Sequence, residues 1–300
     1  MCRRLIIIIL SFVTAQCLGF ALVTTTILAQ SPQPDTSVSS DEAIREADQN
    51  RATAEMILDR AIERSEAQDE SNRELDFESI VLYTVEKLNG DGEVTDTETT
   101  KYRRYPLEGL LYEELIERDG LALDEDDVRK AAKDKREFIE EVQKHAERDE
   151  EYEPDEYSSV KFNREMMSRY NIALVGTDTV GEDLCWVLEF VPREGKLPDE
   201  KRMDKALNRS TGKMWITQND YGVARISFEM QKPFRYLWGI VATLRHAKGQ
   251  LDFIRVSPEV WYPSTFDLHL DLSVFFRGIR RHIRQDLIEY QPLDTTIALH

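Results

Sequence analysis

The centre of the chain holds two apolar runs, Ile172 to Val175 and Leu184 to Val191, which are separated by glycines and a cluster of Thr, Asp and Glu. This pattern predicts a β-hairpin with a short polar loop. Side chains alternate between the two faces of a strand, so one face of the second run carries Leu184, Trp186, Leu188 and Phe190. The other face is also mostly apolar. Such a strand is expected in the middle of a sheet that is covered or that lines a cavity.

A helix and three strands are predicted before this hairpin. Apolar residues recur at helical spacing between Asp41 and Gln68, in a narrow, Ala-rich stripe that suits a helix lying across a surface. The turn signal Asn89-Gly90-Asp91-Gly92 then separates two β-branched and aromatic segments. Three consecutive antiparallel strands are predicted, at Phe77 to Leu88, Val94 to Pro106 and Leu110 to Arg118.

An acidic, Lys-containing segment follows the three strands, from about residue 124 to residue 158. Its apolar residues have helical period, and Asp124 to Asp127 favour the positive end of a helix dipole. The segment is therefore predicted to be a long helical insertion with one thin apolar seam. We favour a solvated helix that packs one edge on the sheet over an acidic arm that binds a partner. Phe162 to Tyr170 is predicted to form a second, short helix.

More strands are predicted after the central hairpin. Lys213 to Thr217 and Val223 to Lys232 form one hairpin, Leu251 to Val256 is a strand, and Phe234 to His246 fits either a strand or a helix. A last hairpin begins at Thr265. A two-residue turn at Arg277-Gly278 predicts three cross-strand pairs: Asp271 with Arg284, His269 with Asp286, and Leu272 with Ile283.

One face of this last hairpin is apolar and the other is charged. Asp267, His269 and Asp271 are interpreted as the solvated face of a strand. The alternative is a metal site, since alternate strand residues share a face and these residue types bind metals. Because charge pairing is available to them, no metal site is predicted.

The first 29 residues have the pattern of a secretion leader. Arg3 and Arg4 precede a nearly uninterrupted apolar run from Leu5 to Leu28. Residues 1–29 are predicted to be a signal peptide, with a retained N-terminal anchor as the alternative, since the apolar run is long for a signal. Residues 30–40 are predicted to be a flexible linker, and residues 41–300 a single domain. The chain is thus expected to be exported to the periplasm or anchored in the inner membrane.

Composition limits the partners. The formal net charge of the chain is −18, which disfavours nucleic acid and anionic membrane surfaces as partners. Membrane contact is expected only through the leader or during transient delivery. Cleavage after Ala29 would remove Cys2 and Cys17, and Cys185 is expected to be a buried apolar residue. The chain contains no phosphate-binding Gly-rich loop, GxSxG, CxxC or HExxH motif, so neither a cofactor nor an enzymatic activity is predicted.

Several short phrases, taken together, resemble the exported LolA-like superfamily of lipoprotein-sorting proteins, which includes LolA, LolB and LppX. These phrases are Leu174-Val-Gly176 with Val180-Gly181, Cys185-Trp186-Val-Leu-Glu189, Met214-Trp215-Ile216 with Tyr221 and Arg225, and Val260-Trp261-Tyr-Pro263. The resemblance spans roughly Ala43 to Tyr290. It implies an α+β fold in which a strongly curved antiparallel sheet, a half-barrel, is covered by helices over an apolar cavity that takes acyl chains.

The resemblance also implies a function, namely a periplasmic carrier or binder of a lipid or lipoprotein acyl group. The candidate cavity-lining residues are Val81, Tyr83, Tyr112, Trp186, Leu188, Trp215 and Phe228. Arg103 or Arg104 is the candidate for an arginine that holds the lid. The alternative is a sensor or regulatory module that binds an envelope protein on the same fold. An envelope hydrolase is a third, weaker reading.

Overall fold

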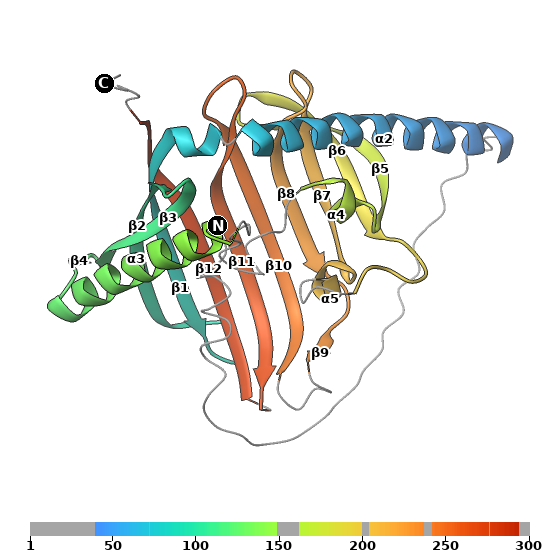
Figure 1. Ribbon diagram of the computed structural model, residues 1–300. Helices are drawn as coiled ribbons and strands as arrows, with labels where there is room; N and C mark the ends of the chain where they lie inside the picture. The colour runs from blue at the N-terminus through green and yellow to red at the C-terminus, as the bar shows by residue number, and fades with distance from the viewer. Residues whose placement is uncertain are drawn as a thin grey trace, which may run out of the picture.

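The computed structural model describes residues 40–71, 73–148, 162–199, 204–236, 242–275 and 277–293. Within these residues the chain forms one sheet and a few helices (Figure 1). The elements are α2 (Ser40–Ser71), a 3₁₀ helix (Arg73–Asp76), β1 (Phe77–Leu88), β2 (Val94–Leu107), β3 (Leu110–Arg118), β4 (Leu121–Ala122), α3 (Glu125–Ala146), α4 (Arg164–Met167), β5 (Tyr170–Val180), β6 (Asp183–Pro192), α5 (Asp204–Leu207), β7 (Ser210–Thr217), β8 (Val223–Met230), β9 (Phe234–Tyr236), β10 (Ala242–Arg255), β11 (Trp261–Val274) and β12 (Arg277–Pro292).

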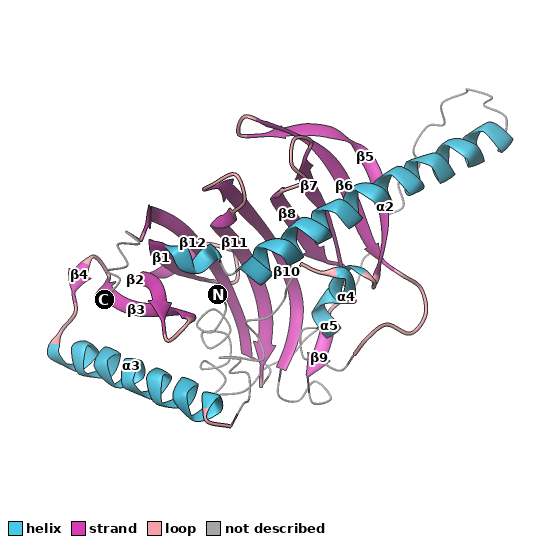
Figure 2. Cartoon of the chain, turned by 45° about the horizontal axis from the view of Figure 1, so that its top comes forward, coloured by secondary structure: helices cyan, strands magenta, loops and turns pink. Residues whose placement is uncertain are grey.

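The sheet is antiparallel throughout and open. Its strand order is β4-β3-β2-β1-β12-β11-β10-β8-β7-β6-β5, and β9 pairs with β10. The first long strand and the last one are therefore neighbours near the middle, while β4 and β5 form the two edges. The sheet is strongly curved, and α2 crosses its concave side (Figure 2). The predicted α+β class with a curved antiparallel sheet is confirmed.

The two faces of the sheet have opposite character. We call the face on which α2 lies the inner face and the opposite one the outer face. One row of directly paired residues on the inner face runs from β1 to β8 through Val85, Ile283, Leu268, Gly249 and Phe228. Gly249 leaves room for the Phe228 ring, since an added Cβ would lie 2.6 Å from it.

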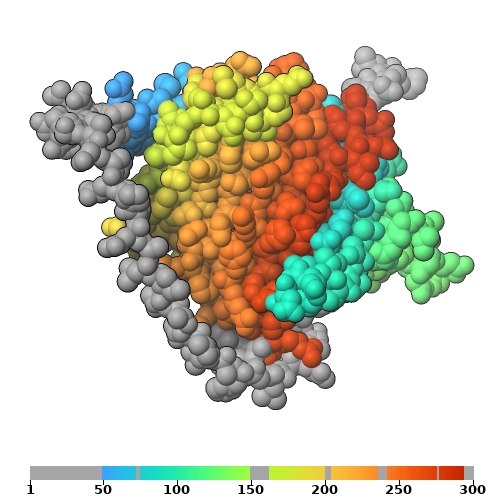
Figure 3. Space-filling view, turned by 180° about the vertical axis from the view of Figure 1, so that it is seen from behind, coloured from blue at the N-terminus to red at the C-terminus, as the bar shows by residue number. Residues whose placement is uncertain are grey.

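The neighbouring row points to the outer face and is charged. It runs across the same strands through Glu86, His282, His269, Lys248 and Glu229. Figure 3 looks onto this face, where the side chains of the strands coloured yellow to red form the surface. The alternation seen in the sequence thus produces a sheet with one apolar and one charged side over its central strands.

Helix α2 confirms the helix predicted over residues 41–68, and it lies across the sheet as its narrow stripe indicated. Among the α2 residues whose burial is described, from residue 49 on, the buried apolar ones are Ala54, Ile57, Leu58, Ala61 and Ile62. They share one cluster with inner-face residues of β6 and β7, such as Leu188, Met214 and Ile216. We call this the α2 cluster.

Helix α3 confirms the predicted acidic helix over part of its length. Asp124 caps its N-terminus by accepting a hydrogen bond from the Asp127 amide at 2.8 Å. Phe138 is its buried residue and packs on Tyr112 of β3, with ring centroids 4.9 Å apart. Because Glu113 and Leu115 face inward, Tyr112 points outward, and α3 packs on the outer side of β3. The predicted extension over residues 149–158 lies outside the described residues.

Two predictions about the C-terminal strands need correction. The segment that fitted strand or helix belongs partly to β9 and to β10, and β10 is much longer than the predicted strand. The last pair of this hairpin is Val274 with Arg277, and Phe275, which follows Val274, has a positive φ of 43°. Asp271 therefore pairs with Arg280, His269 with His282, and Leu272 with Ile279.

This shift by four residues preserves the faces of the two strands and changes every partner. A shift by an even number of residues keeps each side chain on its side of the sheet. Leu268, Leu270 and Leu272 are buried on the inner face, and Asp267, His269 and Asp271 point outward as predicted.

The leader and most of the linker lie outside the described residues. Residues 1–39 belong to that part of the chain, so the signal peptide, the alternative anchor and the linker over residues 30–39 remain predictions. Ser40 already belongs to α2. None of the helices in the described ranges is both long and apolar enough to span a membrane.

Candidate ligand-binding surface

Five of the seven candidate lining residues lie on the inner face. Val81, Tyr83 and Leu188 are buried, and Trp186 and Phe228 are half-buried. Trp186 stacks on Tyr221 with ring centroids 5.3 Å apart. The inner face therefore brings together residues that are up to about 150 positions apart in the sequence.

The other two candidates, Tyr112 and Trp215, point to the outer face and line no inner surface. Tyr112 lies under Phe138 of α3. Trp215 pairs with Val187 and Arg225, and its Nε1 donates a hydrogen bond to Asp178 at 3.0 Å. Tyr112 lies on β3 and Trp215 on β7, and both of these strands have apolar residues on both faces. The alternation of apolar and polar residues therefore did not assign the two aromatic side chains to a face.

A second cluster lies on the middle of the inner face, and among the described residues all its buried members come from strands. We call this set the central apolar cluster. Its buried members are Val81, Tyr83, Val85, Tyr102, Leu115, Met230, Ala247, Leu268, Leu270, Leu272, Val274 and Ile283. They come from β1, β2, β3, β8, β10, β11 and β12, whereas the described residues of α2 belong to the separate α2 cluster.

A buried polar network lies beside the central apolar cluster. Arg104 of β2 is 1% exposed and forms hydrogen bonds with Glu113, Tyr83 and Tyr262. Its Nε lies 2.9 Å from Oε1 of Glu113, and the Tyr83 hydroxyl donates to the same oxygen at 3.0 Å. Ser79 completes the network, with its hydroxyl 3.3 Å from that of Tyr262. The network joins β1, β2, β3 and β11 on the inner face.

Arg103 and Arg104 have different surroundings. Burial disfavours the charged form of Arg104, but the adjacent Glu113 carboxylate raises the pKa of its guanidinium well above the usual value. Arg103 points outward, is about half exposed, and forms two hydrogen bonds of 2.7 Å with Glu78. Of the two lid candidates, Arg104 is therefore the one on the inner face. Its hydrogen bonds to Glu113, Tyr83 and Tyr262 connect Arg104 to residues of strands.

The helix α2 is held by a different group of residues, which the sequence analysis missed. Gln68 exchanges two hydrogen bonds with the backbone of Trp261, at 2.9 and 3.1 Å. Arg64 forms an ion pair with Asp220 at 3.0 Å and donates to the Pro258 carbonyl at 3.1 Å. Arg64 and Gln68 lie three and seven residues after Ala61, on the same side of the helix as its apolar stripe. This spacing could have indicated from the sequence that both side chains face the sheet.

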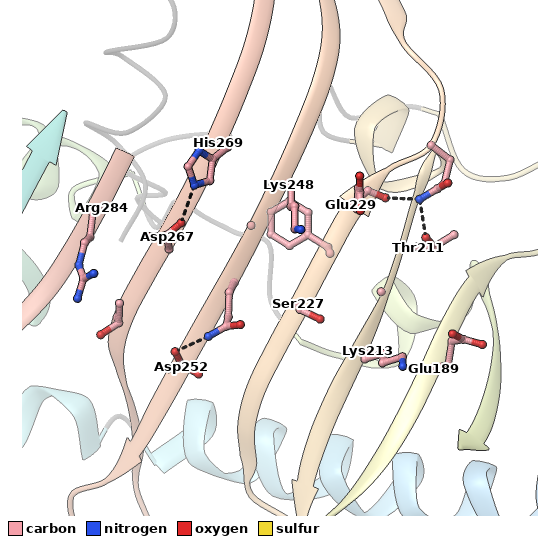
Figure 4. A pocket seen from close by; sticks show the side chains of 16 residues that line it. Glu189, Thr211, Lys213, Ser227, Glu229, Lys248, Asp252, Asp267, His269 and Arg284 are labelled. Atoms are coloured by element: carbon pink, nitrogen blue, oxygen red, sulfur yellow. Dashed lines mark hydrogen bonds and ion pairs between the residues drawn. The ribbon is translucent and has the colours of Figure 1, made fainter. Parts of the chain in front are cut away.

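The outer face carries a chain of ionisable groups. His282 contacts two carboxylates, with Nδ1 2.8 Å from Glu86 and Nε2 2.9 Å from Asp267. Nε2 of His269 lies 3.4 Å from the other Asp267 oxygen. Figure 4 shows this contact, with Lys248 and Arg284 on the neighbouring strands. Burial opposes protonation of His282, but its hydrogen bonds to Asp267 and Glu86 raise its pKa. Burial and the neighbouring His282 lower the pKa of His269.

Comparison with known proteins gives similarities to solved structures. No protein-family model matches the chain, and no curated protein matches it by sequence. A domain assigned to the outer membrane lipoprotein-sorting proteins, from Vibrio parahaemolyticus, is 13% identical, with a TM-score of 0.32 over 81% of this chain and 94% of that one. A LolA superfamily protein from Nitrosomonas europaea is 10% identical, with a TM-score of 0.26 over 80% and 94%.

A third similar structure is that of a protein complex. The complex of MucA and MucB from Pseudomonas aeruginosa contains a chain that is 10% identical, with a TM-score of 0.22 over 77% of this chain and 98% of that one. The solved structures that are similar to this chain include a protein of the LolA superfamily, which the sequence also resembles.

Proposed function

We propose that this protein is a periplasmic carrier or binder of a lipid or a lipoprotein acyl group. The ligand lies on the inner face of the sheet and is bound without covalent chemistry. The observation that carries this proposal is the central apolar cluster, an apolar surface built by seven strands and no described residue of α2. The leader predicted from the sequence supplies the route to the periplasm.

A sheet with one apolar face needs a second layer on that face. The described residues of α2 cover the inner face at β6 and β7, and α3 packs outside β3. In this proposal an acyl chain packs on the apolar inner face of β1, β12, β11 and β10. Each buried CH₂ group contributes about 0.8 kcal/mol, so a chain of ten such groups contributes roughly 8 kcal/mol before ordering costs.

The outer face is unsuited to such a ligand. Its central rows carry both acidic and basic residues, as in the row Glu86, His282, His269, Lys248 and Glu229. Placing an acyl chain there would desolvate these charges, at a cost of several kcal/mol for each unpaired group. The difference between the faces favours the inner one as the site of the proposed ligand.

The test combines purification from the cell envelope in mild detergent with native mass spectrometry and lipid extraction. Two variants on one strand separate the faces, because Phe228 packs on the inner-face clusters and its neighbour on β8, Ser227, lies on the opposite face. We expect stoichiometric acyl species on the wild-type protein and on Ser227→Glu, and a loss of at least tenfold on Phe228→Glu. Circular dichroism checks that both variants fold. An empty wild-type protein that takes up no added lipid would refute the proposal.

A second candidate function is a regulatory module that binds an envelope protein. The observation that favours it is α3, whose 22 residues bury one side chain, Phe138, and leave Val128 52% exposed. Co-purification of one envelope protein in stoichiometric amount, lost in Val128→Asp and retained in Phe228→Glu, would support this function instead.

A further inference from the structure

Two histidines and an aspartate from neighbouring strands meet on the outer face. His269 of β11 lies directly opposite His282 of β12, and their rings stack with centroids 4.1 Å apart and planes 3° from parallel. The Nε2 atoms lie 2.9 Å (His282) and 3.4 Å (His269) from the carboxylate oxygens of Asp267. One ligand atom from each of the three residues lies within 4.8 Å of the other two.

We propose that Asp267, His269 and His282 form a binding site for a divalent transition-metal ion of the Zn²⁺ type. Imidazole nitrogen and carboxylate oxygen are the usual non-sulfur ligands of Zn²⁺, and a set of three leaves one tetrahedral position for water. Because a ligand atom from each of the three residues lies within 4.8 Å of the other two, one ion needs only small movements of both Nε2 atoms. The Asp267 carboxylate already lies between them.

Glu86 supplies the second contact that a metal-binding histidine needs. Its Oε2 lies 2.8 Å from Nδ1 of His282. When Nδ1 carries the proton, Nε2 presents its lone pair to the ion, and the carboxylate increases the basicity of the ring. Glu86 belongs to β1, so three adjacent strands, β1, β12 and β11, hold the site rigidly in register.

Charge and exposure fit a cation with an open coordination position. Asp267 and Glu86 bring two negative charges. The neighbouring cations are Lys248, which lies opposite His269, and Arg284, which lies opposite Asp267 and forms its ion pair with Asp286. The side chain of His269 is 52% exposed, that of Asp267 32% and that of His282 21%. The ion would therefore be reached from solvent, and its remaining ligand is water.

Calorimetric titration of the purified, metal-free protein with Zn²⁺ tests the site. We expect one ion per chain, with affinity at least tenfold weaker in each of His269→Gln, His282→Gln and Asp267→Asn. The matched control is His246→Gln, an exposed histidine on the adjacent β10 that lies 3.7 Å from Glu229 and outside the cluster. It should bind like the wild type.

Co²⁺ provides a second readout that a merely structural change would not alter. A site with two nitrogen ligands and one carboxylate should give the intense visible absorption of four- or five-coordinate Co²⁺, and this absorption should vanish in His269→Gln. Glu86→Gln removes the carboxylate that contacts Nδ1 of His282, and it should weaken metal binding about tenfold. Zn²⁺ binding that is absent in the wild type, or unchanged in both histidine variants, would overturn the proposal.

Discussion

Gln68 of α2 and Trp261 of β11 exchange two hydrogen bonds, as two residues of paired strands do. The Trp261 amide donates to Oε1 of Gln68 at 2.9 Å, and Nε2 of Gln68 donates to the Trp261 carbonyl at 3.1 Å. A side-chain amide thus takes the place of a peptide group and attaches the helix to the end of a strand. The apolar stripe gives α2 its affinity for the sheet, and Gln68 fixes where the helix lies along it.

Replacement of Gln68 by Ala should therefore loosen α2. Both Trp261 backbone groups lose their partner, and an unsatisfied, partly buried polar group costs about 1–3 kcal/mol. Urea denaturation should show a loss of this size, and hydrogen exchange should accelerate first in α2. The exposed Glu70 offers a control on the same helix. A Gln68→Ala variant as stable as Glu70→Ala would show that the pair does not hold the helix.

The ion pair between Arg64 and Asp220 should make this attachment sensitive to acid. Burial disfavours ionisation of Asp220, but hydrogen bonds from Thr217, Trp261 and Gly222 and the charge of Arg64 lower the pKa of its carboxyl. A carboxyl whose pKa is lower in the folded state stabilises the fold above the pKa of the unfolded chain. That stabilisation is lost as the pH falls through the lower, folded value.

We expect Asp220→Asn to reduce stability at pH 7 and to flatten its decline between about pH 5 and pH 2. Equilibrium unfolding in urea across this range measures both effects. The exposed Asp199 is the matched control, and Asp199→Asn should follow the wild-type curve. A curve for Asp220→Asn parallel to the wild type would rule out this contribution.

Arg103 and Arg104 are adjacent in sequence and should respond very differently to substitution. Arg104→Met leaves Glu113 charged and buried without its partner, which costs about 3–5 kcal/mol. Arg103→Met removes an exposed ion pair with Glu78, worth about 0–1 kcal/mol. The midpoints of urea denaturation compare the two directly.

A double variant separates the pair itself from the charge it leaves behind. Arg104→Met combined with Glu113→Leu replaces both charges by apolar groups, which is often close to neutral for a buried pair. The double variant should regain most of the stability lost in Arg104→Met. Equal losses in Arg103→Met and Arg104→Met would contradict the role assigned to the buried network.

Much of the fold follows from local sequence signals. β1 and β3 begin and end at the predicted residues, because alternating apolar residues stop at turn residues such as Asn89-Gly90. The helix predicted over residues 41–68 corresponds to α2, which has one more residue at its N-terminal end and three more at its C-terminal end. These features depend on residues close together in the chain.

The register between β11 and β12, the two strands of the last hairpin, was not predicted correctly. Asp267 and Asp271 are four residues apart, as are Arg280 and Arg284, so two registers keep the same faces and place Asp opposite Arg. The predicted register makes one such pair. The observed one makes two, Asp271 with Arg280 and Asp267 with Arg284. Counting pairs would have chosen the observed register, and with it the contact between His269 and His282.

Cys185 should be an unreactive thiol in the folded protein. It is fully buried, and burial raises the pKa of the thiol to about 11. At pH 8 only about 0.1% of such a thiol is the reactive thiolate, far less than for an ordinary cysteine. Peptide mapping after iodoacetamide treatment should find Cys185 almost unmodified at pH 8, increasingly modified as the pH approaches 11, and rapidly modified at pH 8 in guanidinium chloride. Equal rates at pH 8 with and without denaturant would mean that β6 opens far more readily than its buried place between β5 and β7 implies.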